Sequence, residues 1–377
     1  MTSISPSPLR ILHVILKISP TNEQYNEHCL PVMHSRDITI CTYFKSTLTP
    51  PAAITLYEGD GSVRGFFRAA RAALKENEYD VIHVHTPHAG VLLILALLLC
   101  GLYRKQMAIS VHTVHNSYQN FKLRHKLMFL PSFALYRRLV FCSHSAFESF
   151  PAFYKWLGGG RMGVVQNAVD LERIDRALKG EPSDNPSLFT IATVGLIRMK
   201  NPFTILEAFR QSDSLDSRLV YIGEGSLRPV LTRQVQAAGL HDRVQCTGLI
   251  EREQVFGVFA QSDVFVSASF GEGLPVAVLE AMACRCPVVL SDIAPHREIA
   301  EGVDFIPLVD PQDVAGFARE IEKIRALPAA QRAILGGQCR SLIEQRFSLL
   351  AMHAGYEKIY AQISGPRQPL SLRMMLD

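Results

Sequence analysis

Two carboxylates stand eight residues apart in the segment Phe270–Val289 (FGEGLPVAVLEAMACRCPVV). Glu272 lies in a glycine-rich turn after an apolar run, and Glu280 lies a turn or so into a helical pattern. Because one carboxylate accepts two or more hydroxyl hydrogen bonds, such a pair suits the diols of ribose and hexose. On spacing alone, an ordinary acid near a helix start and a solvated helix residue explain the pair equally well.

The same turn has the features of a phosphate site. Gly271 and Gly273 allow the backbone to turn and to approach a ligand closely. Pro275 suits the first turn of a helix, where its missing N–H costs nothing. The helix start would then present free amide donors to a diphosphate, and the candidate donors are those of Gly273, Leu274 and Val276.

Histidines lie at the ends of two other apolar runs. His115 ends the run SVHTVHN, and a neutral imidazole there can donate or accept a hydrogen bond near a sugar and an attacking hydroxyl. A satisfied core histidine is the alternative. His112 comes earlier in the same run, where we expect burial. In VIHVHTPH we expect a structural hydrogen bond for His83 and a place in a cleft for His85.

The composition is that of a globular protein with 377 residues, a length that fits two domains. The net charge of +4 gives no case for nucleic acid as a partner. The eight cysteines stand mostly in apolar runs, and Cys284 and Cys286 form the only close pair. We therefore expect reduced packing cysteines, no metal site, no cofactor and a cytoplasmic protein.

Apolar β-rich runs alternate with helical patterns along the whole chain, which predicts α/β architecture with parallel sheets. The run Gly180–Ser187 (GEPSDNPS) is dense in turn formers and should link two halves. Helical patterns continue to about Ile363, and Gly365–Asp377 should be a loose tail. The expected strands are Ile11–Leu16, Ile38–Cys41, Val81–His85, Ala108–His112, Leu139–Cys142, Val164–Gln166, Phe189–Val194, Leu219–Ile222, Val244–Thr247, Val264–Val266, Val288–Leu290 and Asp304–Ile306.

The segment with the two glutamates resembles the Glu-x7-Glu motif of retaining GT-B glycosyltransferases in family 4 (glycosyl transferases group 1). The resemblance extends from about Asp80 to Ile363 and includes six other stretches, VIHVH, HTVHNSY, VVQNAVDLERI, GLIRMKNP, YIGEG and SDIAPHREI. It implies a GT-B fold, in which two Rossmann-like domains with parallel sheets face a central cleft. Residues 1–180 would form the acceptor-side domain and residues 181–345 the nucleotide-sugar domain. Residues 346–377 would supply a helix that packs back toward the first domain, plus a tail.

The resemblance also assigns roles to single residues. Glu272 would hold the hydroxyls of the donor sugar, Glu280 would hold the ribose, and His115 would touch the sugar. Lys200 would lie against the donor diphosphate, where a point cation stabilises the charge that develops on the leaving group. A solvated loop lysine is the alternative for Lys200.

Other positions carry weaker assignments or depart from the family pattern. The family commonly has an arginine where this chain has Gly195, so Arg198 is the nearest substitute for a phosphate contact. The glycines of Gly223-Glu224-Gly225 would let backbone approach the nucleotide, although an ordinary strand-to-helix turn explains them equally well. The stretch Thr247–Ile250 matches the backbone that holds the base. Many relatives have a glycine-rich loop where this chain has Ser19–Cys29, so Asn26 and Glu27 become candidates for donor or acceptor contact.

Two segments bear on membranes. Ala89–Tyr103 is apolar for fifteen residues, too short to span a bilayer, and we interpret it as a buried helix over a sheet. Asn120–Arg138 interleaves large apolar residues with cations, which suits either an interfacial helix on anionic lipid or a domain helix with a solvated basic face. The five cations are Lys122, Arg124, Lys126, Arg137 and Arg138.

The sequence therefore predicts a metal-independent, retaining hexosyltransferase that uses a UDP- or GDP-sugar donor. Its acceptor would be a glycan or a lipid-linked hydroxyl, and contact with the cytoplasmic face of a membrane would be peripheral. A nucleotide-sugar epimerase of the same fold and a noncatalytic sugar-nucleotide-binding protein are the alternatives.

Overall fold

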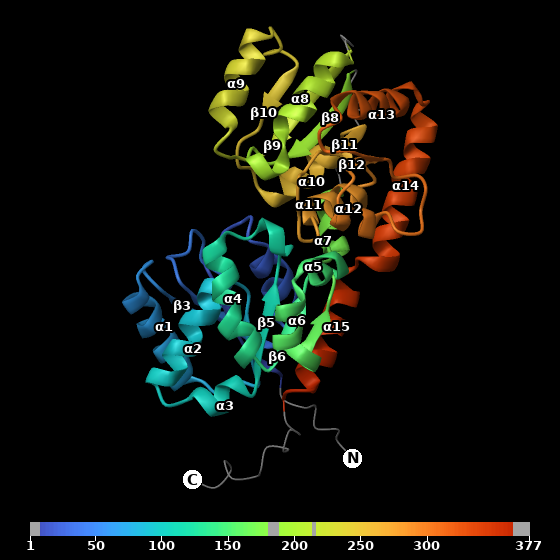
Figure 1. The fold of residues 1–377 in the computed structure, drawn as a ribbon. Helices are drawn as coiled ribbons and strands as arrows, with labels where there is room; N and C mark the ends of the chain where they lie inside the picture. Colours follow the sequence, from blue (N-terminus) through green and yellow to red (C-terminus); the bar gives the residue numbers. More distant parts are fainter. Residues whose placement is uncertain (1–7, 180–187, 213–215, 365–377) are drawn as a thin grey trace.

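The computed structural model describes residues 8–179, 188–212 and 216–364, and these form two lobes, each built on a parallel sheet with helices on its faces (Figure 1). The expected linker Gly180–Ser187 and the expected tail Gly365–Asp377 lie outside the described residues. Every strand pair in both sheets is parallel. The α/β GT-B architecture expected from the sequence is therefore confirmed.

The first sheet has seven strands in the order β3-β2-β1-β4-β5-β6-β7. The long apolar runs form its strands because both faces are covered by helices. β3 was not expected, since this edge strand buries only Ile54 and lacks a long apolar run. The strands are β1 (Arg10–Ile15), β2 (Asp37–Thr42), β3 (Ile54–Glu58), β4 (Val81–Val84), β5 (Ser110–Val114), β6 (Arg138–Phe141) and β7 (Met162–Val164).

The second sheet has six strands in the order β10-β9-β8-β11-β12-β13. The expected strand Asp304–Ile306 is wrong, because the strand forms at Leu308–Val309, directly after Pro307, whose carbonyl accepts a hydrogen bond from the Leu290 amide. The strands are β8 (Phe189–Val194), β9 (Ser217–Ile222), β10 (Val244–Cys246), β11 (Val264–Ser267), β12 (Val288–Ser291) and β13 (Leu308–Val309).

Helices cover both sheets and connect successive strands. In the first lobe they are α1 (Val63–Glu76), α2 (Pro87–Leu99), α3 (Tyr103–Met107), α4 (Leu123–Leu135), α5 (His144–Ser149) and α6 (Ala152–Gly158). In the second they are α7 (Leu171–Ala177), which packs on α10 and α11, and α8 (Pro202–Gln211), α9 (Arg228–Ala237), α10 (Arg252–Ala260), α11 (Val276–Ala283), α12 (Ala294–Ile299), α13 (Val314–Ala326) and α14 (Ala329–Arg346). Short turns are η1 (Tyr25–Cys29), η2 (Leu30–Val32), η3 (Tyr118–Asn120), η4 (Gly159–Arg161) and η5 (Arg198–Lys200).

The last helix, α15 (Leu349–Ala361), lies along the first lobe (Figure 1). Its Met352, Tyr356 and Tyr360 are buried in the same apolar core as Ile11 of β1 and Val111 of β5. The chain therefore crosses from the second lobe back to the first at α15.

The helix α2 is only partly buried, which corrects the expectation for the segment Ala89–Tyr103. Leu93 and Leu97 are fully buried, but Leu98 and Leu99 are 54% and 75% exposed. Among the helices of the described ranges, none combines the length and the apolar character that a bilayer crossing requires.

Candidate active site

The loops after the carboxyl ends of both sheets bring three of the predicted residues to the seam between the lobes. His115 follows β5, Lys200 ends the turn η5 after β8, and Glu272 lies in the loop between β11 and α11. Lys200 Nζ lies 2.7 Å from Glu272 Oε1, which also accepts a hydrogen bond of 2.7 Å from Ser269 Oγ. The structure therefore brings Lys200 and Glu272, which the sequence assigned to different parts of the donor, into one ion pair.

Glu272 is ionised in this setting. Burial raises the pKa of its carboxyl, but the Lys200 ammonium and the Ser269 hydroxyl outweigh burial and hold that pKa below its ordinary value. Its backbone carbonyl accepts hydrogen bonds from Ser117 Oγ at 2.7 Å and from Asn120 Nδ2 at 3.3 Å. Side chains of the first lobe thus fix the loop that carries the carboxylate.

Packing of the lobes explains the glycines of this loop better than ligand approach does. A Cβ at Gly273 would lie 2.3 Å from the carbonyl oxygen of His115, and one at Gly271 would lie 2.3 Å from Asn120 Oδ1. The Gly273 carbonyl also accepts a hydrogen bond of 2.8 Å from Ser143 Oγ. A side chain at Gly273 would therefore push the lobes apart, and one at Gly271 would displace the Asn120 side chain.

The histidines divide as expected, with one correction. His112 is fully buried, and His83 hydrogen-bonds Tyr360 Oη at 2.7 Å and Thr113 Oγ1 at 2.6 Å. His85 does not line the cleft as expected, because it is 3% exposed and lies behind His115, with 3.0 Å between His85 Nδ1 and His115 Nε2. Burial lowers the pKa of His115 to about 4, so its imidazole is neutral at neutral pH.

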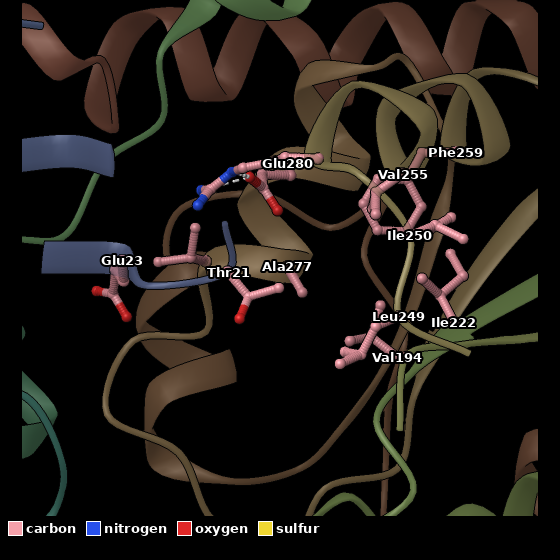
Figure 2. A pocket seen from close by; sticks show the side chains of 13 residues that line it. Thr21, Glu23, Val194, Ile222, Leu249, Ile250, Val255, Phe259, Ala277 and Glu280 are labelled. Carbon is pink, nitrogen blue, oxygen red and sulfur yellow. Dashed lines mark hydrogen bonds and ion pairs between the residues drawn. The ribbon is translucent and has the colours of Figure 1, made fainter. Parts of the chain in front are cut away.

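A cavity of about 220 Å³ opens between the lobes beside these residues (Figure 2). Glu280, Val276 and Gly223 line it as predicted donor-binding residues, and Glu23 and Thr21 enter it from the first lobe. The rest of the wall is mostly apolar and includes the predicted base segment: Val194, Ile222, Leu249, Ile250, Arg252, Val255, Phe259 and Ala277. An apolar wall with a few carboxylates and one cation suits a nucleoside.

Glu280 is one end of a chain of ion pairs that connects the two lobes, and both ends of this chain are buried. Its Oε1 lies 2.5 Å from Arg252 Nη2, which also lies 2.8 Å from Glu27 Oε1. Glu280 is 7% exposed, so the solvated-residue interpretation is wrong. Glu27 and Asn26, which accepts from Arg173 Nη1 at 2.7 Å, are buried and join the lobes instead of facing a ligand.

The remaining predicted donor residues stand outside the cavity wall. Arg198 is exposed on η5, and Leu274 is buried in the core of the second lobe. A Cβ at Gly225 would lie 2.1 Å from the Leu196 carbonyl oxygen, so this glycine serves close packing of the chain. Gly195 has φ +87°, a region that an arginine adopts only with strain.

Two groups of three histidines have one nitrogen each within 4.8 Å of one another, His13 with His83 and His85, and His28 with His85 and His115. The sequence had suggested no such groups. Both nitrogens of His83 are engaged by Tyr360 and Thr113, and both nitrogens of His85 by His13 and His115. The ring nitrogens of His83 and His85 are thus already used in hydrogen bonds.

Comparison with known families matches both lobes. The model of the group described as Glycosyltransferase Family 4 matches residues 43–173, and that of Glycosyl transferases group 1 matches residues 188–326. The chain belongs to the family 4, group 1 glycosyltransferases. It is therefore a transferase, and the epimerase alternative finds no support.

Named relatives of this glycosyltransferase span most of its length. It is 26% identical over 351 residues to an Escherichia coli UDP-Gal:alpha-D-GlcNAc-diphosphoundecaprenol alpha-1,3-galactosyltransferase, covering 87% of each chain. A GDP-mannose:cellobiosyl-diphosphopolyprenol alpha-mannosyltransferase of Komagataeibacter xylinus is 24% identical, over 62% of this chain and 58% of the relative. The fold is similar to that of HepE from Anabaena in complex with UDP, with a TM-score of 0.73, 17% identity, and coverage of 94% and 100%.

Sequence reasoning missed two residues of this glycosyltransferase's cleft. Glu23 Oε1 lies 3.9 Å from His115 Nδ1. Burial raises the pKa of the Glu23 carboxyl to about 7, because burial and the nearby Glu280 and Glu272 carboxylates together outweigh the opposing charge of Arg252. Arg252 begins α10 and stands between Glu27 and Glu280. Glu23 could have been found, because it is an acidic residue in the Ser19–Cys29 loop, which lacks the glycines of many relatives. Arg252 could not, because its two partners are distant in sequence.

Proposed function

We propose that this glycosyltransferase moves a hexose from a UDP- or GDP-sugar to an acceptor hydroxyl with retention of anomeric configuration. The observation that carries the proposal is the Lys200–Glu272 pair, together with a cavity between the lobes whose lining residue Glu23 lies 3.9 Å from His115 Nδ1. The names of the relatives support it, since they specify UDP-galactose and GDP-mannose donors and alpha linkages.

The donor would lie across the seam. Its base would rest against the apolar wall at Leu249 and Ile250, and its ribose would bind Glu280. The diphosphate would meet Lys200, with further contacts from the exposed Arg198 and from the backbone of Gly223 and Val276, which line the cavity. The sugar would then lie between Glu272 and His115.

The chemistry of transfer follows from this placement. As the bond from the anomeric carbon to the diphosphate breaks, negative charge grows on the leaving oxygens, and the Lys200 ammonium stabilises it. Glu272, ionised in the structure, accepts hydrogen bonds from sugar hydroxyls and holds the anomeric carbon in place. The acceptor hydroxyl would attack the face from which the nucleotide departs, and the departing phosphate oxygen would take its proton. This course retains the configuration.

The lobes would divide the work between the substrates. Residues 181–345 would bind the donor, residues 1–180 would present the acceptor, and residues 346–377 would tie the two lobes together through α15. The acceptor would be a lipid-linked glycan, since two relatives are named for diphospholipid-linked acceptors.

The protein would contact the cytoplasmic face of a membrane through one surface of the first lobe. The helix α4 packs between α2 and α6, and all three expose large apolar side chains. Lys122 and Arg124, both exposed, stand at the start of α4. Arg138, which was expected among the cations of this surface, is instead the first residue of β6, and its Nη1 donates a hydrogen bond to the Gly160 carbonyl. The apolar side chains are Leu95, Leu98, Leu99, Leu123, Leu127, Leu135, Phe153 and Trp156.

Thermal unfolding with a panel of UDP-, GDP- and ADP-sugars tests the donor assignment. A bound donor stabilises the folded state by mass action, by about 2.7 kcal/mol at one hundred times its dissociation constant, and this raises the melting temperature. We expect a UDP- or GDP-sugar to raise it and the same sugar to be consumed when a polyprenyl-diphosphate-linked sugar is added. A rise with ADP-sugars alone would contradict the donor assignment, and binding without turnover over a panel of acceptors would favour the noncatalytic alternative.

A further inference from the structure

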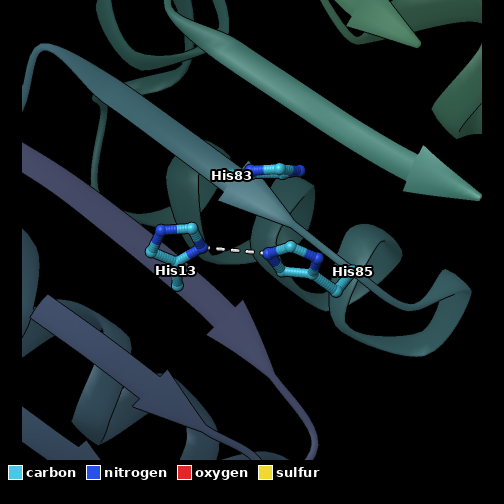
Figure 3. Close-up of side chains that lie close together, drawn as sticks. All are labelled: His13, His83 and His85. Carbon is cyan, nitrogen blue, oxygen red and sulfur yellow. Dashed lines mark hydrogen bonds between the residues drawn. The ribbon is translucent and has the colours of Figure 1, made fainter. Parts of the chain in front are cut away.

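Three histidine side chains form a hydrogen-bonded row that ends at the cleft. His13 lies on β1, His85 directly follows β4, and His115 directly follows β5. His13 Nδ1 lies 2.9 Å from His85 Nε2, and His85 Nδ1 lies 3.0 Å from His115 Nε2. Figure 3 shows the first of these contacts between two neighbouring strands. The free Nδ1 of His115 faces Glu23 Oε1 at 3.9 Å.

All three rings are neutral at neutral pH. Burial, with Arg36 and His353 adding to it, lowers the pKa of His13 to about 3, and burial lowers that of His115 to about 4. Burial also lowers the pKa of His85 well below its ordinary value. A neutral imidazole carries one N–H and one bare nitrogen. Each contact in the row needs one of each, so the three protons all point the same way, either toward the cleft or into the core.

The two ends of the row decide the direction. If the protons pointed into the core, His13 Nε2 would carry a buried N–H, and this atom has no hydrogen-bond partner among the described residues. A bare His115 Nδ1 would then face Glu23 Oε1, an acceptor oxygen that already receives a hydrogen bond of 2.6 Å from Asn167 Nδ2. Protons that point toward the cleft direct His115 Nδ1–H at this acceptor oxygen and leave a bare nitrogen, instead of a buried N–H, at His13 Nε2.

The neighbouring histidines do not compete for the row. Both nitrogens of His83 are engaged by Tyr360 and Thr113, so His83 only stacks on His85 with ring centroids 4.0 Å apart. His28 meets the His85 ring edge-on at 4.9 Å between centroids.

We infer that His13 and His85 are positioning residues that hold His115 as the Nδ1–H tautomer, with its proton directed at Glu23 and the cleft. This inference rests on the proposed function for its catalytic meaning. His115 is then a hydrogen-bond donor to an oxygen of the bound sugar, and its cleft-facing nitrogen cannot take the proton of the attacking hydroxyl. That proton leaves with the nucleotide phosphate, as the mechanism above requires.

Nitrogen NMR of the full-length protein labelled with 15N-histidine tests the inference without any substrate. Couplings between ring protons and nitrogens distinguish a protonated nitrogen from a bare one, and loss of a signal in His115→Ala assigns it. We expect wild-type His115 to carry its proton on Nδ1. A proton on Nε2 would overturn the inference and leave the proposed function intact.

Variants of His85 separate positioning from general packing. His85→Leu removes the donor to His115 Nε2, so we expect a mixture of His115 tautomers and a fall in kcat of about tenfold or more with little change in donor KM. His85→Asn places an amide N–H near the lost Nδ1, so we expect the Nδ1–H tautomer and most of kcat to return. If folded His85→Leu kept the same His115 tautomer as wild type, the inference would also be overturned. If His85→Leu does not fold, the tautomer of His115 in the wild-type spectrum decides the inference.

Discussion

Lys200 holds its ammonium 2.7 Å from the carboxylate of Glu272, across 72 residues of sequence and between two strand-end loops. Both groups are largely buried, with side chains 24% and 12% exposed. The cation needed for a diphosphate and the acceptor needed for sugar hydroxyls are therefore held together, next to His115. A donor that binds here shares the lysine with Glu272, so the position of the sugar and the charge on the leaving group are coupled.

The stability of the protein should depend on the ionisation of Glu23. Its pKa in the folded protein, about 7, lies above the ordinary 4.5, so the folded state binds this proton more tightly than the unfolded chain does. Stability contributed by the protonated group is present below about pH 4.5 and is lost as the pH rises toward 7. We therefore expect wild type to lose stability relative to Glu23→Gln over this range in urea unfolding. A difference that stays constant with pH would contradict the assignment.

Removal of Arg252 should destabilise the fold. Arg252→Ala leaves Glu27 and Glu280, which are 1% and 7% exposed, without their shared cation. Breaking a buried pair in this way costs about 3–5 kcal/mol. Urea unfolding should report that loss, whereas Arg233→Ala, at an exposed position on α9, should change stability little. If Arg252→Ala and Arg233→Ala changed the free energy of unfolding equally, the Glu27–Arg252–Glu280 ion pairs would have no structural role.

Glu280 should act mainly on donor affinity. In Glu280→Ala we expect the donor dissociation constant to rise about tenfold, the scale of one lost hydrogen bond, while transfer at saturating donor remains. Calorimetry with the donor found in the panel, together with kcat, separates the two effects. A loss of kcat with unchanged affinity would place Glu280 at the reacting sugar instead.

Activity should survive EDTA, because the lysine supplies the charge that a divalent cation supplies in other phosphoryl sites. The check is transfer rate after dialysis against the chelator, with and without added Mg²⁺ or Mn²⁺. Complete loss that either ion restores would contradict the metal-independent mechanism.

The basic start of α4 should dock the protein on anionic lipid. Each cation near such a surface contributes about 1 kcal/mol, so Lys122→Glu with Arg124→Glu should reduce co-sedimentation with anionic vesicles and leave neutral vesicles unbound. Trp156→Ser should weaken it further, because this exposed indole would enter the interface. The matched charge change at Arg233 and Lys323, on helices of the second lobe, should have no effect. Absence of wild-type binding at low salt would end the idea.

Sequence periodicity predicted most of the fold because doubly covered strands are long apolar runs, as in Phe189–Val194, which formed as expected. It failed at the edge strand β3, whose residues are mostly not buried. It also failed at the last strand, which begins only after Pro307. In the site, local motifs led to Glu272, Lys200 and His115. Arg252 and Glu27 could not be found this way, since they are 225 residues apart and only tertiary packing pairs them.

The central claim is that the Lys200–Glu272 pair performs sugar transfer, and single-turnover transfer rates of two variants test it most directly. Lys200→Ala and Glu272→Ala should each lower transfer by about a hundredfold or more, the scale of one lost electrostatic contact in the transition state. The Lys323–Glu320 ion pair on α13, at 2.8 Å, provides matched controls, Lys323→Ala and Glu320→Ala, which should transfer at the wild-type rate. A wild-type rate in folded Lys200→Ala or Glu272→Ala would contradict the assignment of the active site.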